Sequence, residues 1–305
     1  MIEPPEVAVV GVGAIGGVCA AALAAAGRAV VCCVRTRFDA LVVEAPGGTI
    51  QCAPRVATDP GQVHPARWVV VATKAHQTDG AAAWLAPLAA GGARVAVLQN
   101  GVEQVARLSR WLDADRIVPV VVACPATAIA PGHVIQRAAA RFTVPDDAGG
   151  RELAALFADT AIAIERTADW PTAAWRKLCS NVTGGALAAL AGAPVREARH
   201  PRLRDLALAL AHECAGVGRA EGADVPASFA DEVAAEAMVS SGAPSTLVDR
   251  RHRRPLEVDA RNGAVVRLAL RHGIATPANA RAAALMARAH GDPDRDLLPE
   301  LATAL

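Results

Sequence analysis

The hydrophobic pattern of the chain changes character near residue 170. Before that position, short apolar runs rich in valine alternate with alanine-rich stretches of helical character, as strands separated by helices do. The expected strands are 7–10, 29–34, 50–52, 68–72, 94–98 and 117–123, with shorter ones near 134, 142 and 162, and the expected helices are 18–26, 79–90 and 104–112. This alternation predicts a doubly wound parallel sheet, and the later short strands predict an antiparallel edge added to it.

The rest of the chain has no convincing strand. Its amphipathic stretches predict helices over 172–191, 203–221, 228–239, 256–272 and 277–290. A chain of 305 residues also exceeds one typical α/β domain. We therefore expect an α/β domain over residues 1–168 and an all-helical domain over 169–305, with a ligand cleft between them beside the carboxyl ends of the strands.

Composition excludes several classes of partner. The 31 basic residues balance 30 acidic ones, so the formal net charge of +1 gives no electrostatic case for binding nucleic acid or a membrane surface. No apolar run approaches the roughly 20 residues that span a bilayer, and residues 1–6 lack the basic start of a secretory signal, so we expect a soluble cytoplasmic protein. The 7 cysteines are scattered without a CxxC pair, which predicts reduced, buried thiols and no metal site.

The strand at 7–10 leads into a glycine-rich turn that opens the first helix, Gly11-Val12-Gly13-Ala14-Ile15-Gly16. In dinucleotide-binding turns of this kind, the first glycine permits the sharp turn and the second lets the backbone approach the pyrophosphate. The third allows the helix to pack closely on the sheet, and the helix N-terminus attracts the phosphates. Because an apolar strand and an alanine-rich helix flank the turn, we interpret these residues as a cofactor site rather than an ordinary turn.

The tip of the second strand indicates which dinucleotide binds. NAD-binding proteins carry an acidic residue there for a ribose hydroxyl, whereas an arginine pairs with the 2′-phosphate of NADP. Arg35 occupies this place, and Arg37 adds a second positive charge. A solvated loop arginine is the alternative explanation, but guanidinium–phosphate pairing is the better match, and we favour NADPH.

Two polar residues follow neighbouring strands of the predicted sheet. Lys74 comes after the strand at 68–72, and Asn100 comes after the strand at 94–98. Either could be an ordinary loop residue. Their equivalent positions at the carboxyl ends of two strands, where α/β sheets bind ligands, favour a function for both.

The second domain offers candidates whose local explanations are ordinary. Lys177 and Asn181 are four residues apart in the helix 172–191 and share a face, but a solvated lysine is common there, and asparagine is a poor residue inside a helix. Glu257 opens the helix 256–272, where it would complement the helix dipole, and Ser245 has the place of a helix N-cap. Spacing along the sequence does not bring Lys177, Glu257 and Ser245 together.

A series of motifs nevertheless runs through the chain in order. They are Gly11-x-Gly13-Ala14-Ile15-Gly16-Gly17, Thr73-Lys74-Ala75, Gln99-Asn100-Gly101-Val102-Glu103, Trp175-Arg176-Lys177-Leu178-x-x-Asn181, Ser245-Thr246-Leu247-x-Asp249, Glu257-x-Asp259-x-x-Asn262-Gly263 and Gly273-Ile274-x-Thr276-Pro277-x-Asn279. Together they resemble the ketopantoate reductases. The resemblance implies an NADP-binding Rossmann domain, a helical substrate domain, and the NADPH-dependent reduction of a 2-keto acid to a D-type 2-hydroxy acid.

The same resemblance implies roles for individual residues. Lys177 would be the general acid that protonates the developing alkoxide, and Glu257 would hold the hydroxyl of substrate or product. Asn100, Asn181 and Ser245 match positions that hydrogen-bond the substrate, and Lys74 matches a lysine that lines the cofactor and active-site cleft.

The chain departs from the family at Gly185, where relatives commonly carry an asparagine that faces the substrate. The pair Gly184-Gly185 also weakens the helix, and together these changes predict a larger or differently polar pocket. Three hypotheses follow: a ketopantoate reductase that feeds pantothenate synthesis, a reductase of a bulkier 2-keto acid, and a non-catalytic NADPH-binding regulator. The presence of Lys177 and Glu257 argues against the regulator, while the sequence does not separate the first two hypotheses and leaves a homodimer open.

Overall fold

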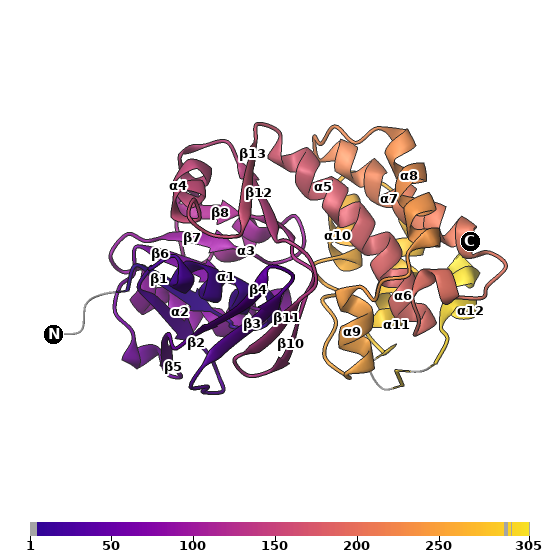
Figure 1. The fold of residues 1–305 in the computed structure, drawn as a ribbon. Coiled ribbons are helices and arrows are strands. Elements are labelled where there is room, and N and C mark those ends of the chain that lie inside the picture. The colour runs from indigo at the N-terminus through magenta and orange to yellow at the C-terminus, as the bar shows by residue number, and fades with distance from the viewer. Residues whose placement is uncertain (1–4, 290–291, 294, 305) are drawn as a thin grey trace. The chain divides into compact units, whose positions relative to one another are not determined.

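The structure, a computed structural model, describes residues 5–289, 292–293 and 295–304. The chain divides into two compact units, Met1–Trp170 and Pro171–Leu305. The first unit carries all the strands assigned within the described residues, and the second is built from helices (Figure 1). The predicted fold class, a doubly wound α/β sheet followed by an all-helical part, is confirmed.

A six-stranded parallel sheet forms the centre of the first unit, in the order β5-β2-β1-β6-β7-β8. Its strands are β1 (Val7–Val10), β2 (Val30–Cys33), β5 (Arg55–Ala57), β6 (Trp68–Val71), β7 (Arg94–Val97) and β8 (Ile117–Pro119). Every residue of β1, β2 and β6 is buried, which explains why these strands are continuous apolar runs. The strand order reverses beside β1, and open α/β sheets bind ligands at such a point.

Helices cover the two faces of this sheet. Val7 and Val9 share a core with α1 (Ala14–Ala25), whereas Ala8 and Val10 share a different core with α2 (Thr78–Ala89). This division follows from the period of two along a strand, which sends successive side chains to opposite faces. The second core also contains Leu108, the last residue of α3 (Gln104–Leu108). The predicted helix 104–112 is therefore shorter than expected.

The predicted antiparallel edge of the main sheet is wrong, because the later strands form two separate sheets. One sheet has the order β10-β11-β3-β4, and the other has the order β13-β12-β9. Their strands are β3 (Leu41–Ala45), β4 (Gly48–Cys52), β9 (Val121–Ala123), β10 (Ala126–Ala130), β11 (His133–Gln136), β12 (Arg141–Pro145) and β13 (Ala163–Thr167). Helix α4 (Ala148–Leu156) lies between β12 and β13 in the chain. The sequence did not predict β3, whose partner β11 lies far away in the chain.

The second unit consists of α5 (Trp170–Ser180), α6 (Ala186–Ala191), α7 (Leu203–Ala220), α8 (Ala227–Val239), α9 (Ser245–Arg251), α10 (Asn262–Arg271), α11 (Pro277–Met286) and α12 (Leu298–Leu301). One apolar core includes residues from three of these helices, namely Leu187 of α6, Leu206 and Leu210 of α7, and Leu285 of α11. The predicted helix end at residue 290, like the outer limits of the two predicted domains at residues 1 and 305, lies outside the described residues. Within those residues, no helix is both long enough and apolar enough to cross a membrane.

Two helix predictions in the second unit need correction. The helix expected over 172–191 is interrupted by a π-helical turn, Asn181–Gly185, which we call the π turn. The glycine pair inside it lowers the stability of a regular helix there. The helix expected over 256–272 begins only at Asn262, so Glu257 is not in the first turn of a helix. Ser245 is the first residue of α9 rather than its N-cap, which is Pro244.

Candidate functional site

The glycine turn after β1 leaves no room for side chains at two of its positions. Gly11 has a φ of +90°, and an ideal Cβ on it would lie 2.6 Å from Thr73 Cγ2. A Cβ on Gly16 would lie 2.1 Å from the Gly11 carbonyl oxygen, so α1 approaches the turn more closely than an alanine allows. By contrast, a Cβ on Gly13 would meet no atom within 4 Å. The backbone at Gly13 therefore borders open space.

That open space lies at the N-terminus of α1. Gly13 is the N-cap of this helix and makes no side-chain hydrogen bond, and the first turn contains no acidic residue. The N–H groups of Ala14, Ile15 and Gly16 belong to the first turn of the helix, where backbone donors have no partner within the helix. They carry the positive end of the helix dipole, so the turn fits the pyrophosphate of a dinucleotide.

Strand register aligns the loops that carry Lys74 and Asn100. Val71 of β6 is paired with Val97 of β7, and each of these two loop residues lies three positions further along its own strand and loop. The structure thus places both residues at the same edge of the sheet, as the sequence predicted. Because Val10 of β1 is paired with Val71, the glycine turn lies at this edge as well.

Two buried glutamines fix these loops, and the sequence analysis did not select either of them. Gln99 Nε2 donates to Thr73 Oγ1 at 3.1 Å, and Gln99 Oε1 accepts from Thr78 Oγ1 at 3.2 Å. Gln104 Nε2 donates to the backbone oxygens of Gln99 at 3.1 Å and Gly101 at 2.8 Å. A polar residue directly after an apolar strand was the available signal, since a buried amide needs partners.

Arg35 lies just beyond the carboxyl end of β2. This strand is next to β1 in the parallel sheet, so Arg35 and the glycine turn lie at the same edge. Its side chain is exposed, and it forms no ion pair with the described residues. Arg37 nearby donates to the Val56 backbone oxygen at 3.5 Å. The Arg35 guanidinium is thus available to an anionic group at this edge.

In the second unit, one arginine connects two of the segments that the sequence could not bring together. Arg261 Nη2 donates to Ser245 Oγ at 2.9 Å and to Glu257 Oε2 at 3.2 Å, while Arg261 Nη1 donates to Thr246 Oγ1 at 2.7 Å. The side chains of Arg261 and Glu257 are only 5% and 2% exposed. Arg261 was not among the predicted site residues, although a charged residue inside the motif around Glu257 was a visible signal.

The π turn belongs to the same group of residues. An ideal Cβ on Gly185 would lie 3.2 Å from Thr246 Oγ1 and 3.5 Å from Arg261 Nη1. Asn181, a predicted substrate ligand, is the first residue of this turn and is half-buried. π-helical turns inside α-helices occur frequently at functional sites, because they redirect side chains within a helix.

Lys177 lies on α5, just before the π turn, and is half-buried. Burial lowers the pKa of its ammonium group, and the positive charge of Arg261 lowers the pKa further, while Glu236 on α8 acts in the opposite direction. The influence of Arg261 links Lys177 to the group formed by Glu257 and Ser245. A lysine with a lowered pKa releases a proton more readily than an ordinary surface lysine does.

Two further residues of the sequence motifs, Asn262 and Asn279, have a structural role. Asn262 Nδ2 donates to the Val182 backbone oxygen of the π turn at 3.2 Å and to Asn279 Oδ1 at 2.9 Å. Asn279 Nδ2 donates in turn to Glu213 Oε2 at 2.8 Å, and the same carboxylate accepts from two backbone N–H groups at the start of α11. These side chains join α7, α10 and α11 to the π turn, so we assign them no direct role in chemistry.

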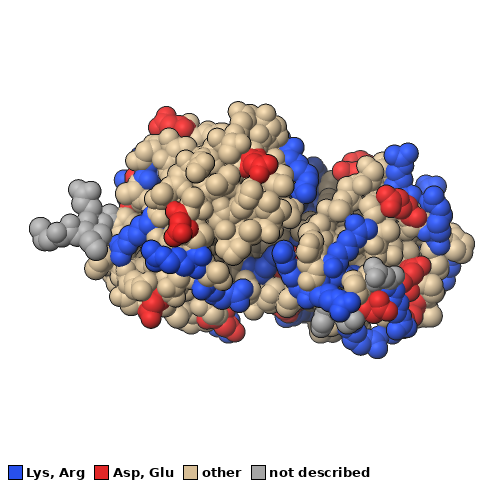
Figure 2. All heavy atoms as spheres, turned by 60° about the horizontal axis from the view of Figure 1, so that its bottom comes forward, with Lys and Arg blue, Asp and Glu red and all other residues tan. Residues whose placement is uncertain are grey.

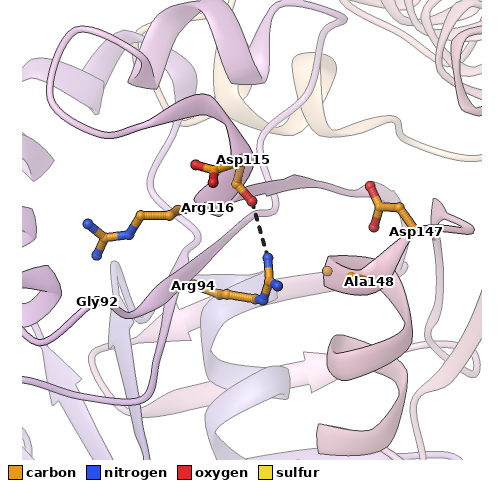
Figure 3. A pocket seen from close by; sticks show the side chains of 7 residues that line it. Gly92, Arg94, Asp115, Arg116, Asp147 and Ala148 are labelled. Atoms are coloured by element: carbon orange, nitrogen blue, oxygen red, sulfur yellow. Dashed lines mark hydrogen bonds between the residues drawn. The ribbon is translucent and has the colours of Figure 1, made fainter.

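A cavity of about 440 Å³ lies elsewhere in the first unit and is lined by Arg94, Arg116 and Asp147 (Figure 3). Arg94 is the first residue of β7, so the cavity lies near the amino end of that strand rather than the carboxyl end. Both guanidinium groups are engaged, Arg94 with Glu152 at 2.8 Å and Arg116 with the Ala89 backbone oxygen at 2.6 Å. The cavity is therefore separate from the edge that carries the glycine turn.

Among the described residues, the cysteines and the other possible metal ligands form no second candidate site. All seven cysteines are free thiols, and burial raises the pKa of Cys32 to about 12 and that of Cys124 to about 11, which opposes formation of the reactive thiolate. No group of three His, Cys, Asp or Glu side chains suited to a metal ion is found in the described ranges. On the face drawn in Figure 2, basic and acidic side chains are mixed over each unit.

Comparison with known proteins gives consistent results along the whole chain. Residues 7–149 match the family model described as ketopantoate reductase PanE/ApbA, and residues 169–290 match the model of its C-terminal part. A 2-dehydropantoate 2-reductase of Caulobacter vibrioides is 44% identical over 284 residues, covering 92% of this chain and 98% of the relative. One from Mycobacterium tuberculosis is 34% identical over 296 residues, covering 94% and 98%.

Solved structures resemble this chain equally far along its length. A PanE/ApbA family ketopantoate reductase from Ralstonia eutropha JMP134 superposes with a TM-score of 0.85 at 29% identity, covering 95% of this chain and 99% of the other. A 2-dehydropantoate 2-reductase from Geobacter metallireducens GS-15 superposes with a TM-score of 0.86 at 27% identity, covering 93% and 99%.

Proposed function

The chain belongs to the ketopantoate reductase family, and from this premise we propose that it reduces 2-dehydropantoate to D-pantoate with NADPH. Membership makes it a nicotinamide-dependent oxidoreductase, as the sequence motifs predicted. The observation that carries the proposal is the hydrogen-bonded group of Arg261, Glu257 and Ser245, whose arginine also lowers the pKa of Lys177. The names of the relatives from Caulobacter vibrioides and Mycobacterium tuberculosis support this choice of 2-keto acid.

The dinucleotide would be held by the first unit. The glycine turn and the first N–H groups of α1 suit the pyrophosphate, and Lys74 and Asn100 lie at the same edge. Arg35, exposed beyond β2, is the residue that we assign to the 2′-phosphate of NADPH. When bound, the nicotinamide supplies the hydride, and the protein supplies orientation and charge.

Lys177 is the proton donor in this proposal. Reduction of a ketone places negative charge on its oxygen, and a cationic lysine within reach stabilises that charge and then transfers a proton to it. The lowered pKa of Lys177 brings it closer to neutral pH, where a general acid is most effective.

Glu257, Ser245, Asn181 and Asn100 are the residues that we assign to substrate binding. Ser245 Oγ accepts a hydrogen bond from Arg261, which leaves the hydroxyl proton to be donated to an anionic or carbonyl oxygen. Glu257, as an ionised carboxylate, is an acceptor only, and it therefore suits a substrate hydroxyl. The two asparagines can donate and accept.

The hypothesis of a bulkier substrate depends on empty space at Gly185. Thr246 Oγ1 and Arg261 Nη1 lie within 3.5 Å of an added Cβ, so this position is bordered by polar side chains rather than by open space. A regulator without catalytic activity would have no need for a lysine of lowered pKa and a buried carboxylate in its second unit. We therefore place ketopantoate reduction ahead of both alternatives.

The direct test measures NADPH oxidation by the purified protein across a panel of 2-keto acids, with ketopantoate included. We expect the highest kcat/KM for ketopantoate and a clear preference for NADPH over NADH. A higher kcat/KM for a bulkier 2-keto acid would contradict the substrate assignment, and no turnover with any 2-keto acid would contradict the reaction itself.

Assembly and location are further parts of this proposal. A structurally similar ketopantoate reductase from Staphylococcus aureus is described as dimeric, and we propose a homodimer here as well. Sedimentation velocity distinguishes a 31.2 kDa monomer from its dimer. A cytoplasmic location stays a prediction from the sequence, to be checked by cell fractionation.

A further inference from the structure

Arg261 has a place in the site that the substrate and cofactor assignments do not explain. It is 4% exposed, and its guanidinium donates hydrogen bonds to side chains on two segments, the start of α9 and the turn before α10. Its Nε atom is buried without a hydrogen-bond partner among the described residues. Burying a guanidinium costs free energy unless its surroundings compensate for it, so its retention here calls for a role beyond packing.

The space for this guanidinium exists because residue 185 is glycine. The backbone of Gly185 has φ −65° and ψ −43°, ordinary helical values that any residue adopts, so conformation does not require glycine. The surrounding space is limited, because a Cβ would lie 3.2 Å from Thr246 Oγ1, closer than most Cβ contacts, and 3.5 Å from Arg261 Nη1, which is an ordinary contact distance. The amide group of an asparagine extends beyond its Cβ and would compete with the guanidinium for the same volume.

The guanidinium of Arg261 also pairs with the Glu257 carboxylate. Burial by itself favours the protonated form of a carboxyl group, and a nearby guanidinium favours the ionised form. Both side chains are buried, and Arg261 Nη2 lies 3.2 Å from Glu257 Oε2, so the guanidinium restrains the orientation of the carboxylate. An ionised Glu257 accepts a hydrogen bond from a substrate hydroxyl, whereas a protonated one also presents a donor.

We propose that Arg261 is a positioning residue, which holds the Glu257 carboxylate in place as the acceptor for a hydroxyl on the substrate, and that glycine at position 185 leaves room for it. The inference rests on the proposed function and narrows the substrate class to 2-keto acids that carry a hydroxyl group. It also implies that positions 185 and 261 are coupled. A side chain larger than that of alanine at 185 would compete with Thr246 and Arg261 for the same space.

The first experiment compares two substrates that differ by one hydroxyl, ketopantoate and 3,3-dimethyl-2-oxobutanoate. In Arg261→Met, kcat/KM for ketopantoate should fall about 10- to 100-fold, the range for one hydrogen bond to a charged group, while that for the analogue should change less than about threefold. Arg261→Lys, which retains the charge, should recover part of the loss. Arg267→Met removes an exposed pair with Asp259 and serves as the control, with both substrates unaffected. Equal losses for the two substrates would overturn the proposal.

The second experiment tests the coupling with a double-mutant cycle. Gly185→Asn in the parent protein should lower kcat/KM for ketopantoate about tenfold or more, because the amide displaces the guanidinium. In the Arg261→Leu background, the same substitution should cost nothing or should raise kcat/KM. Additive effects of the two substitutions would mean that the residues act independently, which the proposal forbids.

The third experiment does not depend on catalytic activity. The pH dependence of labelling of Lys177 by an amine-reactive reagent, read by peptide mass spectrometry, reports the pKa of this lysine. Loss of the positive charge in Arg261→Met should move the labelling midpoint to higher pH, and Arg261→Lys should stay near the parent. Glu236 raises the pKa of Lys177 in all of these proteins, so it does not cause a difference between them. An unchanged midpoint would overturn the proposal. A parent protein that reduces no 2-keto acid, yet shows this shift, would refute the function while supporting the position of Arg261.

Discussion

Replacing Lys177 with methionine separates the chemistry of the protein from its binding of the cofactor. Methionine has a similar length and no proton to donate, so kcat for ketopantoate should fall about 10²- to 10⁴-fold, the contribution of a positioned general acid. This range corresponds to ~2.7 to 5.4 kcal/mol of transition-state free energy. The residues assigned to the dinucleotide all lie in the first unit, so the Kd for NADPH, measured by fluorescence titration, should stay within about twofold.

The structure supplies a matched control and a second observable. Arg176 precedes Lys177 on α5, is exposed and lies over the Phe229 ring at 5.1 Å, so Arg176→Met should leave kcat within about twofold. In the parent protein, activity should decline with rising pH from a value below the ordinary pKa of lysine, since burial and Arg261 both lower the pKa of Lys177. Turnover that survives Lys177→Met within a few-fold would refute the assignment of the acid.

The same substitution should also make the protein more stable. Because the folded-state pKa of Lys177 is lowered, the unfolded chain binds the proton more tightly, and the charged lysine costs folding free energy at every pH below that folded-state pKa. The cost disappears as pH rises above the ordinary pKa of lysine. Urea unfolding of Lys177→Met should therefore show a higher midpoint than the parent at neutral pH, with the difference shrinking at alkaline pH. A lower midpoint at neutral pH would contradict this explanation.

Three further predictions concern the cofactor edge and the interior of the second unit. Arg35→Ala should weaken NADPH about tenfold or more, since a charge-assisted hydrogen bond is worth ~1.5 kcal/mol or more, and should leave NADH unchanged; equal Kd values for both cofactors in the parent would contradict this. Gly13→Ala should lose NADPH binding without loss of stability, whereas Gly16→Ala should lower the thermal midpoint, because only the latter Cβ meets backbone, at 2.1 Å. Arg250→Met should lower the free energy of unfolding, measured with urea, by ~3–5 kcal/mol, because this fully buried arginine donates to backbone oxygens that include those of Ala189 and Ala289. An unaltered unfolding midpoint would show that those oxygens find other partners.

The strands of the central sheet could be predicted because each is defined by its own residues. A run such as Val7–Val10, buried on both faces, is apolar throughout, and the glycine turn that follows marks its end. The β3 strand was missed although it forms a hairpin with β4, and its other partner, β11, lies too far along the chain to be visible in a local window. Glu257 was placed in a helix for a similar reason. The amphipathic pattern does not show that the helix begins only at Asn262, or that the side chain of Glu257 pairs with Arg261.

The departure at Gly185 shows why a single position in this site cannot be interpreted alone. On the sequence, a glycine in place of an amide indicates lost contact and added space. In the structure, the neighbouring Arg261 and Thr246 lie where that side chain would extend, and the arginine brings a positive charge next to Glu257. The same arginine lowers the pKa of Lys177. A side chain at position 185 that displaced Arg261 would therefore change the surroundings of both Lys177 and Glu257. A comparison of substrates therefore has to vary positions 185 and 261 together, because the two residues border the same space and Arg261 hydrogen-bonds to the Glu257 carboxylate.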